Sequence, residues 1–446
     1  MNVRALTAAF LLIGFTSHAN AKLEVHEWGT FTSLVGSNGI TQNGMYHEDE
    51  PLPDFVYGFG EIVTPIVQRP TPRPSPLPPP TDRQRPCRSK ACFADEFLNQ
   101  NVITQKMETP VLYFYSDQPV DVDVNVKFPD GLITETYPGP VLSSPSRADL
   151  KTASGGEATF KIRVLNDTIG KLPTVAADNI YGHARDVASN VVTNRVRNGT
   201  ENEKFIFYRG LGRYSPQFQI ESNQGNLSVT GYLSKLPKHA YLVDVSADGH
   251  ARLMKLVHYC GGLYEVPSAQ INLLRDHSRN PVDESAGIFQ DGNATSEIVT
   301  GLVASGLNQD EAEAMIKTWE HGYLKVPGLR LLSILPRAEV DMILPLTISP
   351  TPEHVERVFV SRIEVLLDTD ETALLNRVSR ETRNLNVATL GRFAESMLRR
   401  VRDVCLSKGA CDALRRGDGG LTSVFDDLIM RASRSSLASA TGATQF

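Results

Sequence analysis

The chain has 446 residues, of which 45 are basic and 51 are acidic, and its formal net charge is −6. Its hydrophobic content of 41% is that of an ordinary globular protein, which excludes the fibrous and wholly disordered classes. The acidic balance argues against a nucleic-acid partner, because general nucleic-acid binders carry an excess of lysine and arginine.

Residues 1–21 have the pattern of a secretory signal peptide. One arginine precedes an apolar stretch over residues 5–15, which is too short to span a bilayer, and Ala19 and Ala21 mark a cleavage site. Cleavage after Ala21 would leave Lys22 as the first residue. No later apolar run reaches the roughly 18 residues of a transmembrane helix. We therefore expect an exported protein, periplasmic or extracellular, without a transmembrane segment; the alternative is a buried N-terminal helix.

Residues 22–260 are predicted to form a β-rich domain. Apolar and polar residues alternate over 120–128, which is the period-two pattern of a half-buried strand. Strands are also expected at 22–35 and 111–115. Further strand candidates are 158–164, 204–208, 217–220, 227–232, 240–245 and 252–259. Strands at such short spacing indicate antiparallel sheets packed like a sandwich.

A proline-rich, basic insertion interrupts this domain at residues 69–90. Seven prolines lie between 70 and 80, and six basic residues accompany a single aspartate, which gives a local charge of +5. Because proline removes backbone donors, we expect an extended or irregular segment whose residues 69–86 are dispensable for folding. The segment is interpreted as a solvated loop, and the alternative is an arm that docks on an anionic surface or polymer.

Residues 261–368 are predicted to be a mixed segment. Apolar residues recur at helical spacing over 296–321, and Asn308 with Glu311 forms a capping box, so a helical hairpin is expected there. Strands are expected to return at 329–335, 342–348 and 357–367.

Residues 369–446 are predicted to be a helical C-terminal region. One helix is expected after Asp370 and another over 387–406, while the small and polar residues 433–446 are expected to fray. The predicted fold class is therefore α+β, with a mainly antiparallel, sandwich-like β body, a helical hairpin and a helical C-terminal region.

Five cysteines suit the oxidising compartment that export implies. Cys405 and Cys411 bracket a turn that contains glycine, and they are predicted to form a local disulfide. Cys87 and Cys92 are the other close pair, which leaves Cys260 as the main free thiol. Pairing across the two clusters stays open.

The segment from His26 onward begins like a zinc-protease helix, but Thr30 stands where the second histidine is needed. As a strand, the segment places Glu27 on one face, and on the other face it places His26, Trp28, Thr30 and Thr32. His26 and Glu27 can each bind a metal or move a proton, although on opposite faces they would not cooperate simply. The alternative is a hydrogen-bonded core histidine beside a tryptophan.

Further candidates lie at or near predicted strand ends, where functional sites are commonly built. These candidates are Glu108, His183, Arg185 and Arg209. The alternative for Glu108 is a salt bridge or strand-entry cap. For His183 and Arg185 it is a structural network, and for Arg209 it is cation–π packing or sheet closure. The candidate metal ligands are His26, His183 and Glu108. No complete hydrolase-elbow, phosphate-loop or dinucleotide-loop motif occurs in the sequence.

Five segments resemble an uncharacterised family of secreted bacterial proteins. These segments are 25–34, 106–115, 203–210, 315–319 and 336–348. The most specific parts are His-Glu-Trp-Gly-Thr-Phe-Thr in the first segment and Met-Glu-Thr-Pro-Val in the second. The resemblance implies an exported bacterial protein and carries over no catalytic residue.

Two functions from different classes are compatible with these features. The first is a binding or structural protein of the envelope, which the β pattern, the basic arm and the lack of a complete catalytic motif favour. The second is a hydrolase or metal-dependent enzyme whose site gathers His26, Glu108, His183, Arg185 and Arg209. Convergence of these side chains within about 6 Å in one cleft would favour the enzyme, and scatter would favour binding. The sequence identifies no cofactor, substrate or partner.

Overall fold

The computed structural model describes residues 22–48, 51–63, 97, 101–196, 199–214, 218–231, 237–256, 263–278, 287–408 and 420–440. The predicted signal peptide and the proline-rich insertion lie outside the described residues, as do Cys87, Cys92, Cys260 and Cys411. The predictions of cleavage, of a dispensable arm and of the disulfide pairs therefore stay predictions.

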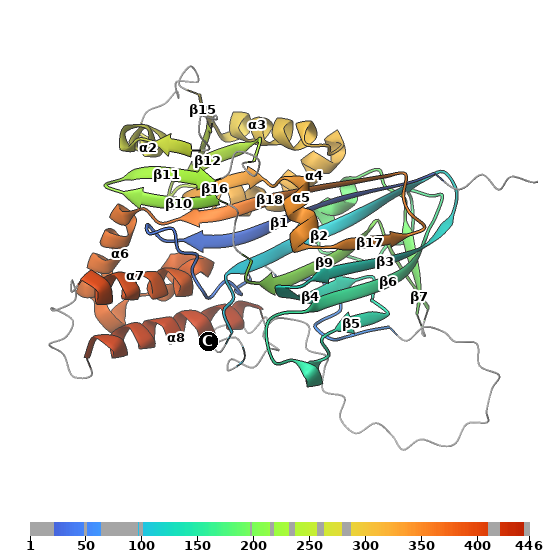
Figure 1. Ribbon diagram of the computed structural model, residues 1–446, viewed down its shortest axis with the longest axis horizontal. Coiled ribbons are helices and arrows are strands. Elements are labelled where there is room, and N and C mark those ends of the chain that lie inside the picture. The colour runs from blue at the N-terminus through green and yellow to red at the C-terminus, as the bar shows by residue number, and fades with distance from the viewer. Residues whose placement is uncertain are drawn as a thin grey trace, which may run out of the picture.

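Within the described residues, a nine-stranded sheet runs through the centre of the molecule in the order β15-β13-β12-β16-β18-β1-β2-β9-β4 (Figure 1). Neighbours are antiparallel except β1 and β18, which run parallel. The strands are β1 Leu23–Val35, β2 Gln105–Ser116, β4 Gly131–Tyr137, β9 Phe205–Gly212, β12 Ala240–Val245, β13 Ala251–Lys255, β15 Ile288–Gln290, β16 Gly328–Ile334 and β18 His354–Val365. The segment 261–368 thus contributes strands to the same sheet as the region before it.

Two smaller sheets accompany the large one. The second sheet has the order β17-β3-β6-β7-β8, with β5 beside β6, and the third has the order β10-β11-β14. Their strands are β3 Val120–Phe128, β5 Leu142–Ser144, β6 Gly156–Val164, β7 Val192–Val196, β8 Gly199–Glu203, β10 Phe218–Asn223, β11 Asn226–Gly231, β14 Leu263–Val266 and β17 Leu346–Ser349.

The large and second sheets share one apolar core. β3 buries Val122 and Val124, and the aspartates between its valines are exposed, which is the alternation that the sequence predicts. From the large sheet, Phe31 on β1 and Phe114 on β2 enter this core opposite Phe160 of β6. The prediction of an α+β protein with a mainly antiparallel, sandwich-like body is confirmed.

The helical hairpin is also present, as α3 (Asp291–Ala304) and α4 (Gln309–Leu324). Asn308 and Glu311 form the expected capping box, in which each side chain satisfies the other residue's backbone N–H. This cap defines where α4 begins. The side chains of Asn308 and Glu311 are therefore engaged in hydrogen bonds at the N-terminus of α4.

The face of the large sheet opposite the second sheet is covered by α4 and by the short 3₁₀ helix η3 (Ile180–Asp186). Met315 and Trp319 of α4 pack there in one core with Trp28 and Tyr113 of the sheet. Both faces of β1 and β2 are thus shielded from water. Their polar side chains must find partners inside the protein.

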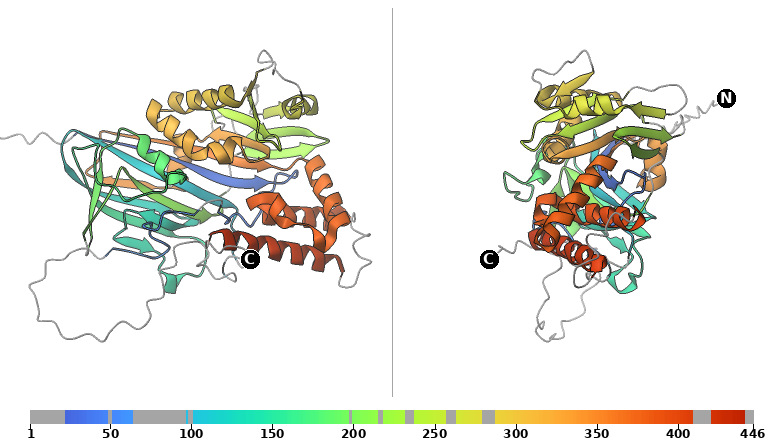
Figure 2. Two further views of the ribbon diagram at one scale, coloured as in Figure 1. Left: turned by 180° about the vertical axis from the view of Figure 1, so that it is seen from behind. Right: turned by 90° about the vertical axis from the view of Figure 1, so that its left-hand side faces the viewer.

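The C-terminal helices gather at one end of the large sheet (Figures 1 and 2). They are α6 Asp368–Glu381, η6 Thr382–Asn384, η7 Val387–Phe393, α7 Ala394–Lys408 and α8 Gly420–Ala440. The expected helical C-terminal region is confirmed. The expectation that residues 433–446 fray is wrong for 433–440, because α8 continues to Ala440 and Ser433 is buried in it, while residues 441–446 lie outside the described residues. The remaining short helices are α2 Ser268–Arg275, α5 Arg337–Ile343 and η2 Arg147–Asp149.

The strand expected at 342–348 is partly wrong, since its first residues belong to α5. Pro336 precedes this helix, where the missing N–H of proline costs nothing. Val340, Ile343 and Leu344 are buried at the spacing of a helix face, not at that of a strand. Only the later part of the segment forms a strand, β17. In the part of the chain that the structure describes, no helix is long and apolar enough to cross a membrane.

Candidate functional site

The segments 25–34 and 106–115 lie side by side, within β1 and β2. The register between these strands shifts between Trp28 and Thr30, so that Gly29 lies opposite the irregular backbone at Thr109. Thr109 has a left-handed φ of 45°. A Cβ at Gly29 would come within 2.6 Å of the Phe359 ring and 3.1 Å of the Pro110 Cα, so only glycine fits there. Bulges of this kind re-aim side chains and are common beside functional sites.

β1 places its polar residues on two faces, as predicted. Thr30 and Thr32 point to the side covered by α4, where their hydroxyls contact the Tyr323 hydroxyl at 2.5 Å and the Glu108 carboxylate at 3.0 Å. Glu27 points to the opposite face and binds the Arg357 guanidinium in a fully buried pair. This separation excludes joint action of His26 and Glu27 at one site.

His26 holds the start of α4 against the sheet. Its Nδ1 lies 2.9 Å from Oε2 of Glu311, and the hydroxyl of Tyr115 donates to Oε1 of the same carboxylate at 2.6 Å. Burial is the largest single influence and disfavours the charged imidazole. The hydrogen bond to Glu311 and the negative charges of Glu311, Glu356 and Glu24 together outweigh it and raise the pKa of His26. Glu311 also accepts from the N–H of Asn308. The arrangement fits the structural alternative for His26.

The two candidates on η3 do not join His26. Arg185 binds Glu203 through Nε at 3.0 Å and Nη2 at 2.6 Å, and its Nη1 donates to the carbonyl oxygen of Pro173. Burial raises the pKa of Glu203, against the pull of Arg185. His183 lies half-buried on η3. Arg185 is therefore part of a structural network, which was the alternative interpretation.

Glu108 and Arg209 do come together, through residues that the sequence analysis did not single out. Lys106 Nζ lies 2.5 Å from Glu48 Oε2 and 3.1 Å from Glu108 Oε1. Arg209 Nη1 binds the same oxygen of Glu48 at 3.2 Å. All four side chains are at most 10% exposed. They form a buried ion network that links β2, β9 and the loop before residue 49.

The C-terminal region completes this network. Arg392 of η7 donates to Glu108 at 2.7 Å. The guanidinium carbons of Arg392 and Arg362 lie 4.8 and 5.3 Å from the centre of the Phe393 ring. Burial would raise the pKa of Glu108, but Arg392 and Lys106 hold it well below its usual value. Glu108 is therefore ionised at neutral pH.

Helix α7 fixes the loop that carries Glu48. Glu395 accepts from the Tyr46 hydroxyl at 2.6 Å and contacts Nε2 of His47 at 2.9 Å. The Lys106 ammonium donates to the carbonyl oxygen of His47 at 2.6 Å. Glu48 is therefore held from two sides, by the sheet and by the C-terminal helices.

A small pocket opens beside this ion network. Its lining comes from the loop before residue 49, β2, β9, η3, α4 and η7: Glu48, Lys106, Glu108, Ile180, Arg209, Thr318, Trp319, His321, Gly322 and Arg392. His321 is exposed and marks the mouth, whereas Trp319 is only 5% exposed. The volume of about 30 Å³ suits a few water molecules or one small group, not a whole organic substrate.

The pocket lies far from His26. Thr32, which contacts Glu108, is six residues further along β1 than His26, a separation of about 20 Å on a strand. Of the six candidate residues, the structure gathers only Glu108 and Arg209. Among the described residues there is no group of three or more histidine, cysteine, aspartate or glutamate side chains arranged to hold a metal. His26, His183 and Glu108 are not brought together as a metal site.

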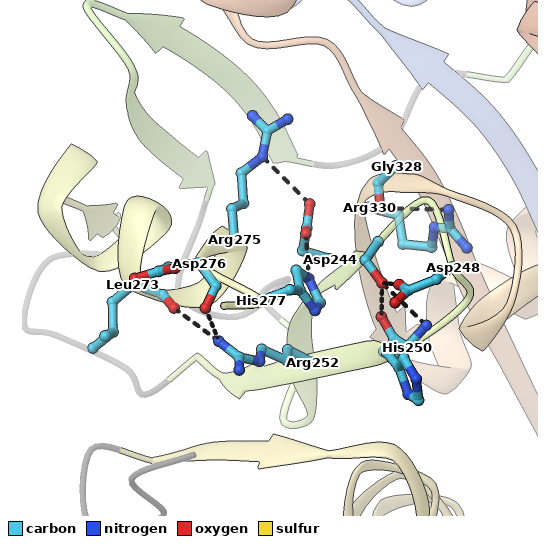
Figure 3. Close-up of polar contacts among 12 residues, drawn as sticks. Asp244, Asp248, His250, Arg252, Leu273, Arg275, Asp276, His277, Gly328 and Arg330 are labelled. Carbon is cyan, nitrogen blue, oxygen red and sulfur yellow. Dashed lines mark hydrogen bonds and ion pairs between the residues drawn. The ribbon is translucent and has the colours of Figure 1, made fainter. Parts of the chain in front are cut away.

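A second polar cluster lies at the other end of the large sheet (Figure 3). Asp244 of β12 binds Nε2 of His277 at 2.9 Å and Nε of Arg275 at 3.4 Å. Arg252 of β13 donates to the carbonyl oxygen of Asp276 at 2.6 Å. Burial raises the pKa of Asp244, although His277 and Arg275 act in the other direction. These contacts fasten the end of α2 to the sheet, and no candidate from the sequence takes part.

Comparison with known proteins identifies no family. No protein-family model matches the chain, and no curated protein matches its sequence. Among solved structures, the Fcho1 Mu homology domain of Danio rerio with bound Eps15 peptide aligns with 78% of this chain and 97% of its own at 7% identity, with a TM-score of 0.23. So low a score carries no argument about fold or function.

Sequence reasoning missed Glu48, Lys106, Trp319 and Arg392. Lys106 had a detectable signal, since a lysine two residues before Glu108 at the start of a buried strand shares its face. Trp319 falls within the apolar helical pattern of 296–321 and is buried on α4, but it also lines the pocket. Arg392 had no signal, because its neighbours across the pocket are far away in sequence.

Proposed function

We propose that this protein is an exported bacterial envelope protein that binds a ligand at the pocket beside Glu108 and Arg209. The observation that carries the proposal is that charged side chains from β2, β9 and η7 converge with α4 on one small opening. Burying so many charges is costly unless the arrangement is stabilised by pairing or serves recognition.

Binding is favoured over catalysis because the candidate catalytic groups are separated and engaged. His26 is paired with Glu311, Glu27 with Arg357, and Arg185 with Glu203. An acid–base or nucleophilic mechanism needs such groups within hydrogen-bond reach of one reacting atom. Because the candidate catalytic side chains are scattered and not gathered in one cleft, the binding interpretation is favoured.

Export rests on the signal-peptide pattern and on the family resemblance. The test is fractionation of cells that express the full chain, followed by mass spectrometry of the protein in each fraction. We expect the protein in the periplasm or medium with Lys22 as its first residue. Cytoplasmic protein that begins at Met1 would refute export.

Ligand binding is tested on the same exported protein by comparing its native mass with its denatured mass. A small molecule retained under native conditions and released on denaturation supports the proposal. His26→Ala should retain the same molecule, because His26 lies far from the pocket. Chemical conversion of the ligand during incubation, abolished by His26→Ala, would favour the enzyme instead.

A further inference from the structure

The pocket walls carry more positive than negative charge. Lys106, Arg209 and Arg392 line the pocket together with two carboxylates, Glu48 and Glu108. Behind Gly322, the Arg362 and Arg330 guanidinium groups share the single carboxylate of Glu364, at 2.7 and 3.2 Å. Glu135 stands beside Arg209 in the β4–β9 register. These pocket residues and their named neighbours comprise five cations and four carboxylates.

Two residues that line the pocket carry hydrogen-bond donors without acceptors among the described residues. Nε of Arg209 and Nε1 of Trp319 are buried and have no hydrogen-bond partner within the described part of the chain. Both residues line the pocket, and they are 4% and 5% exposed. Both terminal nitrogens of Arg362 also lack hydrogen-bond partners among the residues described, and Nη1 lies 2.7 Å from where a Cβ of Gly322 would stand. Unsatisfied buried donors are rare, and each one calls for an explanation.

We propose that the pocket binds one oxyanion group, a phosphate, sulfate or carboxylate, which accepts hydrogen bonds from Arg209 Nε and Trp319 Nε1. The inference rests on the proposed function, since it names the chemical group that the binding site takes. Both atoms can only donate, so they select an acceptor. The volume of about 30 Å³ limits the bound portion to a single small group.

A cation or a neutral donor fits the pocket less well. A metal ion would face Lys106, Arg209 and Arg392 at close range, and the Glu108 carboxylate is already bound to two of these cations. Guanidinium and indole N–H groups are common ligands of oxyanions, and charge-assisted bonds of this kind are the stronger ones. The excess positive charge around the pocket also favours an anion over a cation.

The experiment is calorimetric titration of the exported full-length protein with inorganic phosphate, sulfate and acetate at constant ionic strength. We expect one site per chain for at least one of these anions. Trp319→Phe removes one donor and keeps an aromatic ring, so it should weaken binding about tenfold or more. Comparison of the three anions separates a phosphate or sulfate ligand from a carboxylate ligand.

Trp28→Phe is the matched control. Trp28 is the other tryptophan of the chain and packs in the same core as Trp319, at 0% exposure against 5%. Its Nε1 also lacks a hydrogen-bond partner among the described residues, but Trp28 does not line the pocket. We expect anion affinity to be unchanged in this variant. It also leaves Trp319 as the sole tryptophan, so quenching of its fluorescence by iodide should fall when the oxyanion is bound.

Arg209→Lys tests the second donor without removing the charge. It should weaken binding by a similar factor, and near-ultraviolet circular dichroism checks that the variant is folded. Absence of binding by all three anions, or equal affinity in Trp319→Phe and wild type, would overturn the inference. An exported protein that retains a ligand but binds none of the anions would refute the oxyanion while leaving the binding function standing.

Discussion

Glu108→Gln is the sharpest perturbation of the buried ion network. Glu108 is 1% exposed and accepts from Thr32 at 3.0 Å and Arg392 at 2.7 Å, with Lys106 at 3.1 Å. Glutamine keeps the shape but removes the charge, and its amide N–H₂ would face a cation. Removing one partner of a buried ion pair costs about 3–5 kcal/mol. That is a large share of a total stability of about 5–15 kcal/mol.

The assay is urea unfolding at neutral pH, with the free energy of unfolding compared at an unchanged denaturant slope. Asp123→Asn is the control, because Asp123 makes an exposed salt bridge with Lys161 at 2.8 Å and should cost less than about 1 kcal/mol. A loss below about 1 kcal/mol for Glu108→Gln would refute the reasoning. That result would mean that water or movement already screens the buried charges.

The difference in unfolding free energy between wild type and Glu108→Gln should depend on pH in one direction. The pKa of Glu108 lies well below its ordinary value of 4.5 in the folded protein. The stabilisation that ionised Glu108 gives the folded protein is therefore complete at pH values above 4.5, and it is lost as the pH falls through the lower pKa of the folded state. The stability difference between wild type and Glu108→Gln should shrink in acid. Oxyanion affinity should rise in the variant, because one carboxylate beside the pocket is neutralised.

Further predictions concern other parts of the chain. His26→Ala should cost about 1–3 kcal/mol near pH 6 by breaking the contact with Glu311, and the cost should fall as the pH rises through the raised pKa of His26. Its metal content should equal that of the wild type; loss of a bound metal would support the ligand role instead. Cys405 and Cys411 should resist alkylation under denaturing, non-reducing conditions, and labelling of Cys405 would contradict the predicted pair. Deleting residues 69–86 should move the melting temperature by only a few degrees, corresponding to about 1 kcal/mol, and loss of soluble expression would mean that the arm packs on the body.

Local patterns predicted the elements well where one residue period dominates. The alternating valines of 120–128 specify β3, and the pair Asn308 and Glu311 specifies the start of α4. The face assignment along β1 followed from the same period. These features depend on neighbours a few residues apart, which a sequence shows directly.

Long-range pairing was beyond such patterns. The parallel contact of β1 with β18 joins Trp28 to Val358, which no period reveals. The pocket depends on the packing of η7, since Arg392 reaches Glu108 across 284 positions. Residue types suggested Glu108 and Arg209 as candidates. Only the topology brings them together through Glu48 and Lys106.

The most direct measurement is a crystal structure of the exported protein soaked in selenate, an oxyanion that can be located by its anomalous scattering. The account predicts an anomalous peak in the pocket, within hydrogen-bond distance of Arg209 Nε and Trp319 Nε1. Well-ordered water alone in the pocket, with selenate bound only elsewhere, would contradict it.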